Sequence, residues 1–342
     1  APTPESTPAP SVSTFAVHFI DVGQADAALV VCEGQAMLID GGNKADSNVI
    51  YSVLQRTGVK KLDIVVGTHA HEDHIGSLPY ILPQVNVPIY ATKLTMGIIE
   101  NKLKEHGLLK TTKRKVVKYG QAINLGCFRV EFIRTNHSIA DAAALAIYSP
   151  AGIIVHTGDF KVDYTPVFGE PIDLQRFAEI GKKGVLALMA DSTNVMRPGF
   201  TMSERTVGKT FENIFADNAT RRIIVATFAS NVDRVQQVIN SAYKSGRKVV
   251  VEGRSMVNII ETASNLGCIK IPDNTLVDIE FLKNYPDEKT VIITTGSQGE
   301  PMSALTRMAF SDHRKVEIRP DDYVIISATP IPGNEKTVGK VV

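Results

Sequence analysis

The sequence predicts an α/β protein built of two domains, and three observations support this. Short apolar runs alternate with amphipathic stretches and Gly-containing turns along most of the chain. The length of 342 residues favours two domains or one large α/β domain. Beyond about residue 195 the helix and strand signals alternate regularly, as they do in a parallel βαβ sheet. We therefore expect one domain over 15–194 and a second over 195–342.

The first domain is expected to be rich in strands. Its opening runs are β-branched or apolar and are separated by Gly and Gln turns. A later buried strand ends at His69, and the carboxyl ends of strands are where α/β folds keep their chemistry. The predicted strands are 15–22, 27–31, 36–40, 62–69, 87–92, 127–135, 144–149, 152–159 and 185–192, and the predicted helices are 48–57 and 93–106.

The second domain is expected to hold a parallel sheet whose strands are connected by helices. The predicted helices are 203–215, 232–243 and 255–266, and the predicted strands are 222–228, 248–253, 290–296 and 322–329. Ahead of both domains, residues 1–14 are rich in Pro, Ser and Thr and are expected to form a disordered, extended leader. Such a leader commonly follows a removed export signal, so secretion stays an alternative to a cytoplasmic location.

The composition limits the function classes. No apolar run reaches the ~18 to 20 residues that a membrane span needs, so no membrane partner is expected. A net charge of +1 argues against purely electrostatic binding of nucleic acid, although a neutral protein can carry a basic channel. The three cysteines are far apart in the sequence, which indicates neither a disulfide framework nor a CxxC zinc site.

Four side chains that can bind metal fall within six residues, in the pattern H-x-H-x-D-H. The pattern places His69 and His71 on one side of a tight turn, and Asp73 and His74 on the other, where the next helix begins. Zinc favours imidazole and carboxylate ligands, and a catalytic site keeps one position open for water. The run therefore predicts a hydrolytic centre with two metal ions; the alternative is a polar loop with incidental histidines. In this reading His74 binds the second metal, and Asp73 binds it and accepts a proton from the water.

Three further residues fit such a centre. His137 ends a predicted strand and could complete a three-histidine site, although a single hydrogen-bonded histidine is the alternative. Asp159 also ends a strand, and its carboxylate could bridge both ions; a turn or helix-cap aspartate is the alternative. Asp40 precedes two glycines and could orient the histidine ligands without touching the metal, or could simply belong to an Asp-Gly-Gly turn.

These residues carry a family resemblance. Asp40, the 69–74 cluster, His137 and Asp159 match, in order and context, the metallo-β-lactamase-fold hydrolases. From about His69 onward the chain resembles the ribonuclease J family of β-CASP nucleases. The segments that carry this second resemblance include THAHEDHIGSLPYIL, TNHSIADAAALAI, HTGDFKVD, ADSTNV, ATFASNVDRVQQV, TTGSQGEPMSALTRMA and ISATPIPGNEK.

The resemblance implies a fold, an activity and partners. It implies a metallo-β-lactamase αββα sandwich, incomplete at the C-terminus, with an inserted parallel-sheet β-CASP domain. It also implies zinc-dependent hydrolysis of RNA by a water that two metals activate, as a 5′-to-3′ exonuclease and an endonuclease in RNA processing and decay. It further implies a cytoplasmic location and homo-oligomers, although we expect no counterpart of the family's oligomerising C-terminal domain within these 342 residues.

Two more sites follow from the resemblance. Asp191 matches the first β-CASP motif, an acidic residue close to the metals; the alternative is the cap of a helix beginning at Ser192. Phe228, Ala229 and Ser230 match the family's nucleotide-contacting loop, where a hydroxyl and backbone N–H groups can hold phosphate. The alternative for these three residues is an ordinary strand-to-helix turn with a serine cap.

The sequence departs from the ribonuclease J pattern in two places. Residues 15–68 resemble the competence-type DNA-uptake hydrolase domain of the same superfamily, which indicates a hybrid sequence, natural or recombined. The family's two late histidine motifs do not follow Lys336, so we expect a weakened second metal site. Two alternatives therefore stand beside the ribonuclease: a superfamily hydrolase of another ester, thioester, lactam or phosphodiester, and an inactive RNA-binding remnant.

Overall fold

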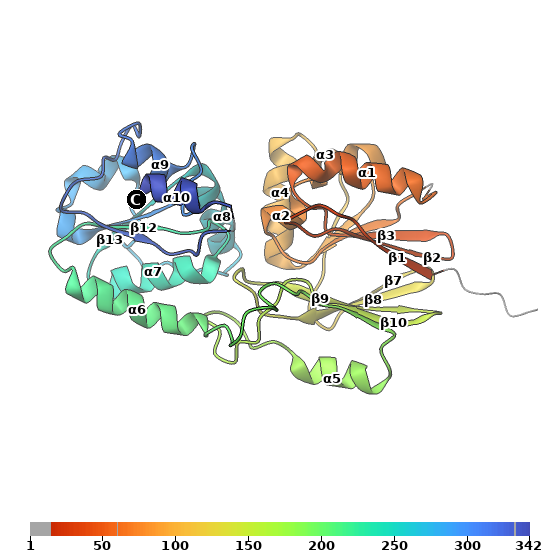
Figure 1. Cartoon of the computed structure of the whole chain (residues 1–342). Helices are drawn as coiled ribbons and strands as arrows, with labels where there is room; N and C mark the ends of the chain where they lie inside the picture. The colour runs from red at the N-terminus through yellow and green to blue at the C-terminus, as the bar shows by residue number, and fades with distance from the viewer. Residues whose placement is uncertain (1–14, 60, 332) are drawn as a thin grey trace, which may run out of the picture. The chain divides into compact units, whose positions relative to one another are not determined.

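The computed structural model describes residues 15–59, 61–331 and 333–342 (Figure 1). The chain forms two compact units. The first comprises the residues up to Arg134 together with 143–159 and 173–191, and the second comprises 135–142, 160–172 and 192–342. The predicted leader, 1–14, lies outside the described residues. No helix in the described part of the chain is both long enough and apolar enough to cross a membrane.

The first sheet of unit 1 has six strands in the order β1-β2-β3-β4-β5-β6. The first three strands pair antiparallel, whereas β3 to β6 pair parallel, because helices provide the connections that return the chain to the same edge. The strands are β1 Phe15–Phe19, β2 Ala28–Cys32, β3 Gln35–Ile39, β4 Ile64–Gly67, β5 Ile89–Ala91 and β6 Arg114–Val116, and the helices are α1 Ser47–Arg56, α2 Glu72–Ile75, α3 Leu78–Val85 and α4 Lys93–Glu105; a short 3-10 helix, η1 Lys44–Asp46, precedes α1.

The second sheet of unit 1 has five strands in the order β11-β10-β9-β8-β7. The strands are β7 Ala122–Leu125, β8 Phe128–Arg134, β9 Ala143–Ser149, β10 Gly152–His156 and β11 Ala187–Met189, and α5 Leu174–Lys182 connects the last two. One apolar core contains buried side chains of both sheets, such as Ile39 from the first and Phe132 from the second. The two sheets therefore pack face to face.

Helices cover the outer faces of this sandwich. In Figure 1, α1 and α3 lie over the first sheet, and α5 lies over the second. On that second face, Ile180 and Phe177 of α5 pack against Ile133 and Val155 of the sheet. The αββα sandwich that the resemblance implies is confirmed.

Unit 2 is built on a four-stranded sheet in the order β13-β14-β12-β15, and all its pairs are parallel. The parallel sheet that the alternating pattern predicts is therefore confirmed. The strands are β12 Ile223–Ala226, β13 Lys248–Glu252, β14 Thr290–Thr294 and β15 Tyr323–Ile326; the helices are α6 Glu204–Asp217, α7 Val232–Lys244, α8 Arg254–Asn265, α9 Ala304–Ala309 and α10 Glu335–Val341, with 3-10 helices η2 Ile279–Asn284 and η3 Asp287–Lys289. Side chains of α9, including Leu305 and Met308, pack against one face of the sheet.

Two helices of unit 1 do not appear among the sequence predictions. The α3 helix carries Pro79 in its first turn and Pro83 inside it, and proline inside a stretch argues against a helix. Its apolar face is nevertheless buried on the sandwich, and this packing outweighs the low intrinsic propensity. The α5 helix begins at Asp173, whose side chain accepts a hydrogen bond from the backbone N–H of Arg176 as an N-cap.

A buried carboxyl group lies inside unit 2, on α7. Asp233 is 6% exposed, and its Oδ1 atom has no hydrogen-bond partner among the described residues. Burial, together with the nearby carboxylates of Glu204 and Asp163, raises the pKa of Asp233 from its ordinary value of 3.8 to about 7, although Lys161 and Arg234 oppose the rise. The folded chain thus keeps a proton on Asp233 over a pH range in which the unfolded chain has already lost it.

The Asp233→Asn variant is expected to be more stable than the wild type at pH 8 and equally stable below about pH 4. Because the folded pKa is raised, the wild type loses stability as the pH rises from about 4 to about 7, while the amide has no proton to lose. The gain at pH 8 is on the order of 2 to 4 kcal/mol, the upper end corresponding to the full difference between the two pKa values. Urea unfolding of both proteins, at pH 8 and below about pH 4, measures this difference in the free energy of unfolding.

The exposed Asp217 on α6 provides the control for this prediction. Asp217→Asn should leave the free energy of unfolding within about 0.5 kcal/mol of the wild type at both pH values. Equal stability of Asp233→Asn and the wild type at pH 8 would show that the buried carboxyl group carries no penalty.

Candidate metal centre

The first two histidines of the motif follow β4 directly. His69 is fully buried, and its Nε2 atom lies 3.1 Å from Nδ1 of His71. His71 is the residue that precedes α2, so the chain turns between the buried strand and the helix, as the H-x-H-x-D-H pattern predicts. This turn brings the imidazoles of His69 and His71 together. His74 lies in α2, and its ring centroid is 3.9 Å from that of His69.

Asp40 organises the buried side of the centre. Its Oδ1 accepts a hydrogen bond from the backbone N–H of Thr68 at 2.8 Å, and its Oδ2 accepts one from the Thr68 hydroxyl at 2.6 Å. The same Oδ2 lies 2.8 Å from Nδ1 of His74. Asp40 has a positive φ of 56°, a conformation that aspartate tolerates better than most residues, and complete burial with three polar partners holds it there.

These hydrogen bonds fix which nitrogen of each ring faces the centre. A carboxylate only accepts hydrogen bonds, so Nδ1 of His74 carries a proton and its Nε2 lone pair points elsewhere. The Thr68 hydroxyl gives its one proton to Asp40, so it accepts from Nδ1 of His69 at 3.1 Å. In both His69 and His74, Nε2 is therefore the nitrogen that can donate an electron pair to a metal once the ring is neutral, as a metal ligand must be.

Asp159 meets both histidines from the other sheet. Its Oδ2 atom lies 3.9 Å from Nε2 of His69 and 3.5 Å from Nε2 of His74. The preceding Gly158 has a positive φ of 57°, and a Cβ atom there would lie 3.1 Å from the carbonyl oxygen of Ala143. Glycine is required at this close approach, and it brings the carboxylate of Asp159 to a position between the two rings.

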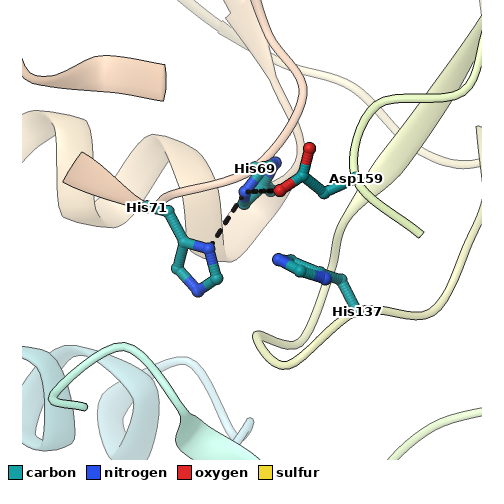
Figure 2. A group of neighbouring side chains, drawn as sticks. All are labelled: His69, His71, His137 and Asp159. Carbon is teal, nitrogen blue, oxygen red and sulfur yellow. Dashed lines mark hydrogen bonds and ion pairs between the residues drawn. The ribbon is translucent and has the colours of Figure 1, made fainter. Parts of the chain in front are cut away.

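Among the described residues, two groups of side chains have the donor atoms and spacing for a metal ion. In the first, one ligand atom each of His69, His71, His137 and Asp159 lies within 4.8 Å of the others (Figure 2). In the second, the ligand atoms of Asp26, Asp40 and His74 do so. Asp73 belongs to neither group, and its proposed role as a ligand stays a prediction.

The electrostatics of the centre follow from its burial and its carboxylates. Burial lowers the pKa of His74, but the carboxylates of Asp40 and Asp159 outweigh this effect and raise that pKa well above its usual range. Burial also raises the pKa of Asp73, while the neighbouring His74 opposes the rise. Without a cation the centre therefore holds a proton on His74, and a metal ion has to displace it.

The donor set of the first group fits zinc. Three imidazoles and one carboxylate, grouped within 4.8 Å, provide the nitrogen and oxygen ligands that zinc binds in catalytic sites. Calcium and magnesium prefer sites made of oxygen ligands alone. The second group also contains an imidazole, at His74.

The structure corrects the alternative interpretations of two other predicted sites. No helix begins at Ser192, because the next helix, α6, begins at Glu204, so Asp191 is not a helix cap. Its backbone N–H instead donates to the Thr157 hydroxyl at 3.0 Å. In unit 2, residues 228–230 form the turn between β12 and α7, but the side chain that caps α7 is Asn231 and not Ser230.

Sequence reasoning did not single out Asp26 or His156, although the structure brings both to the centre. Asp26 ends the loop before β2, and His156 is the last residue of β10; their side chains lie 3.4 Å apart. The only sequence signals were the polar Gln-Ala-Asp turn and a histidine three residues before Asp159. Neither pattern identifies a partner, because the contact joins segments 130 positions apart.

Family models cover most of the chain. Residues 20–221 match the model of the metallo-β-lactamase superfamily. Residues 220–342 match the β-CASP domain of ribonuclease J.

Curated relatives agree with these matches. The chain is 48% identical over 281 residues to ribonuclease J of Synechocystis, which covers 82% of this chain and 44% of the relative. It is 46% identical over 292 residues to ribonuclease J of Helicobacter pylori, covering 85% and 42%. It is 38% identical over 323 residues to ribonuclease J2 of Bacillus subtilis, covering 94% and 57%. The chain thus spans about half the length of the curated relatives it matches.

One solved structure resembles the chain over nearly its whole length. A protein of unknown function from Enterococcus faecalis aligns with a TM-score of 0.60 and 17% sequence identity, covering 97% of this chain and 92% of that one. Because the two sequences are only 17% identical, this similarity supports the assignment of the fold and of nothing else.

Proposed function

The chain belongs to the metallo-β-lactamase superfamily, and we propose that it is a zinc-dependent ribonuclease that hydrolyses RNA phosphodiester bonds. The observation that carries the proposal is the position of Asp159 between the Nε2 atoms of His69 and His74. A carboxylate placed there can bridge two ions, the arrangement used for in-line displacement at phosphorus. The β-CASP match and the relatives named ribonuclease J support RNA as the substrate.

Two ions are proposed, with separate ligand sets. His69, His71 and His137 would hold the first, Asp73 and His74 would hold the second, and Asp159 would be a ligand shared by the two sets. Zinc bound there would lower the pKa of a water and stabilise the charge that develops on the phosphate. Asp73 would accept the proton of that water, a role that its raised pKa favours. Asp40 touches neither ion and instead holds the His74 ring.

The substrate contacts are proposed from the family pattern. Phe228, Ala229 and Ser230 contact a nucleotide through the turn before α7, and Asp191 acts as the acidic residue of the first β-CASP motif. We place the metallo-β-lactamase domain at 15–194 and the β-CASP domain at 195–342. The proposed setting is the cytoplasm, in RNA processing and decay, with both 5′-to-3′ exonuclease and endonuclease activity and with further copies of the chain as partners.

The test is cleavage of a 5′-monophosphorylated RNA labelled at its 3′ end. We expect hydrolysis that stops when a chelator removes the metal and returns when zinc is added. Release of mononucleotides from the 5′ end would show exonuclease activity, and internal fragments would show endonuclease activity. No cleavage at any zinc concentration, with metal bound, would contradict the proposal.

A second substrate class is tested in the same preparation. The competence-type resemblance of residues 15–68 favours a small ester, thioester or lactam as the alternative. Hydrolysis of a β-lactam or a thioester without RNA cleavage would support that alternative.

The Asp40→Asn variant tests the orienting role of Asp40. The amide can still accept from Thr68, but it cannot hold the Nδ1 proton of His74 with a full negative charge. We expect the affinity for the second ion to fall about 10- to 100-fold, the usual effect of losing a partner that orients a ligand. Competition with a chromophoric chelator measures this change, and an affinity equal to that of the wild type would remove Asp40 from the centre.

A further inference from the structure

We propose that Asp26 is a ligand of the second metal ion, together with His74. The inference rests on the proposed two-ion centre and adds to it a residue from the loop between β1 and β2. This loop lies far from the H-x-H-x-D-H motif in the sequence but next to it in unit 1.

The backbone of Asp26 is fixed to both segments that build the second position. Its N–H donates to the carbonyl oxygen of Asp73 at 3.1 Å, and its own carbonyl oxygen accepts from the N–H of Gly42 at 2.9 Å. The first bond ties Asp26 to the metal motif, and the second ties it to the segment that follows Asp40. A ligand on a backbone held at two points needs little reorganisation to bind an ion.

The neighbours of Asp26 differ in their capacity to bind metal. Ligand atoms of Asp26, Asp40 and His74 all lie within 4.8 Å of one another. Both oxygens of Asp40 already accept hydrogen bonds from Thr68, and one of them also faces His74, so Asp40 has little capacity left. Of the three residues, Asp26 therefore has an electron pair available to an ion, and His74 has one once a metal ion displaces its proton.

His156 lies at ion-pair distance from the carboxylate of Asp26. Nδ1 of His156 accepts a hydrogen bond from the N–H of Gly158 at 3.0 Å, so a neutral ring carries its proton on Nε2. That Nε2 atom lies 3.4 Å from Oδ2 of Asp26. The structure gives the other oxygen, Oδ1, no donor among the described residues. This ion-pair contact lies on the Oδ2 side of the carboxylate, which leaves Oδ1 as the oxygen available to a metal ion.

Exposure separates Asp26 from the residues that only support the centre. Its side chain is 34% exposed, whereas that of Asp40 is fully buried. An ion and a water molecule can therefore reach Asp26 from solvent. Its carboxylate also supplies a negative charge that balances a divalent cation next to neutral imidazole.

The experiment counts metal ions in the Asp26→Asn variant. The isosteric amide keeps the backbone hydrogen bonds and can still face His156, but it is a much poorer metal ligand. The purified full chain is stripped of metal and titrated with Zn²⁺ against a chromophoric chelator, and separately with Co²⁺ while the visible spectrum is recorded. Asp21→Asn is the matched control, because Asp21 is an exposed aspartate of the same loop whose carboxylate accepts a hydrogen bond from the N–H of Gly23.

We expect two ions per chain in the wild type and in Asp21→Asn. In Asp26→Asn the first ion should bind unchanged, and the affinity for the second should fall at least about 100-fold, more than for an orienting residue. Asp26→Glu keeps a carboxylate and should bind the second ion more tightly than Asp26→Asn does. Near-UV circular dichroism equal to that of the wild type shows that the variants fold.

Three outcomes would overturn the inference, and they are distinct from a failure of the proposed function. Equal second-ion affinity in Asp26→Asn and Asp21→Asn would assign Asp26 a purely structural role. A single ion in both the wild type and the variant would remove the second position itself. Loss of the first ion as well in Asp26→Asn would show that Asp26 supports the structure of the whole centre and is not a ligand of the second ion alone. A wild-type chain that binds no metal at all would instead refute the metal-dependent ribonuclease.

Discussion

Replacing His71 with alanine is expected to lower the rate of RNA cleavage about 1000-fold or more. His71 supplies one of the four ligand atoms of the first group, and its Nδ1 lies 3.1 Å from Nε2 of the buried His69. Losing a ligand of a metal that stabilises charge costs several kcal/mol in the transition state, and about 4 kcal/mol corresponds to ~1000-fold. The first-order rate at saturating RNA, measured with bound zinc, gives the effect.

His106→Ala is the control for this experiment. His106 is an exposed histidine at the end of α4, bonded to the Tyr80 hydroxyl and to the backbone of Lys102. Its removal should leave both the rate and the bound metal within about twofold of the wild type, because it lies outside both groups of ligands. Cleavage by His71→Ala at the wild-type rate would show that the reaction does not use the first metal position.

Replacing Asp322 with alanine is expected to destabilise unit 2 by about 3 to 5 kcal/mol. Asp322 receives two hydrogen bonds from the guanidinium of Arg222, at 2.8 and 2.5 Å. Both side chains are almost fully buried, with 4% and 2% exposed. They precede β12 and β15, whose first residues, Ile223 and Tyr323, lie opposite each other in the sheet. The alanine variant leaves a buried cation without its counter-charge, and urea unfolding measures the loss.

Two further variants separate the ion pair from other causes. Asp321→Ala removes the exposed neighbouring carboxylate and should change the free energy of unfolding by less than about 0.5 kcal/mol. The double variant Arg222→Met and Asp322→Leu should be more stable than Asp322→Ala, because no unpaired buried charge remains. A loss below about 1 kcal/mol in Asp322→Ala would show that water or the Glu317 carbonyl oxygen, which also accepts from Arg222, compensates the cation.

The regular elements were predictable where the periodicity was strong. The predicted helix 232–243 corresponds to α7, Val232–Lys244, and the predicted strand 248–253 corresponds to β13, Lys248–Glu252. The two prolines of α3 concealed a helix whose stability comes from packing on the sheet. In α3, burial against the sheet outweighs the low helix propensity of the prolines, and no local sequence pattern predicts this burial.

The metal motif was predictable because its residues are close in sequence. Within 69–74, spacing alone placed three histidines and a carboxylate around one turn, and the structure gathers His69, His71 and His74 there. The same kind of pattern did not identify Asp26 or His156. Polar turns and strand ends are common, and the contact between these two side chains joins segments far apart in the sequence. Their proximity depends on how the two sheets of unit 1 pack.

The sequence by itself determined the α/β class, the parallel sheet of unit 2 and the grouping of metal-competent side chains in the H-x-H-x-D-H turn. Apolar periodicity and short-range ligand spacing are local properties, and local patterns record them directly. Only the tertiary structure decided which nitrogen His69 and His74 present, that Asp159 faces both of them, and that a ligand atom of Asp26 lies within 4.8 Å of ligand atoms of Asp40 and His74. Those features depend on hydrogen bonds between segments far apart in the chain, which form only when the two sheets close around their shared core.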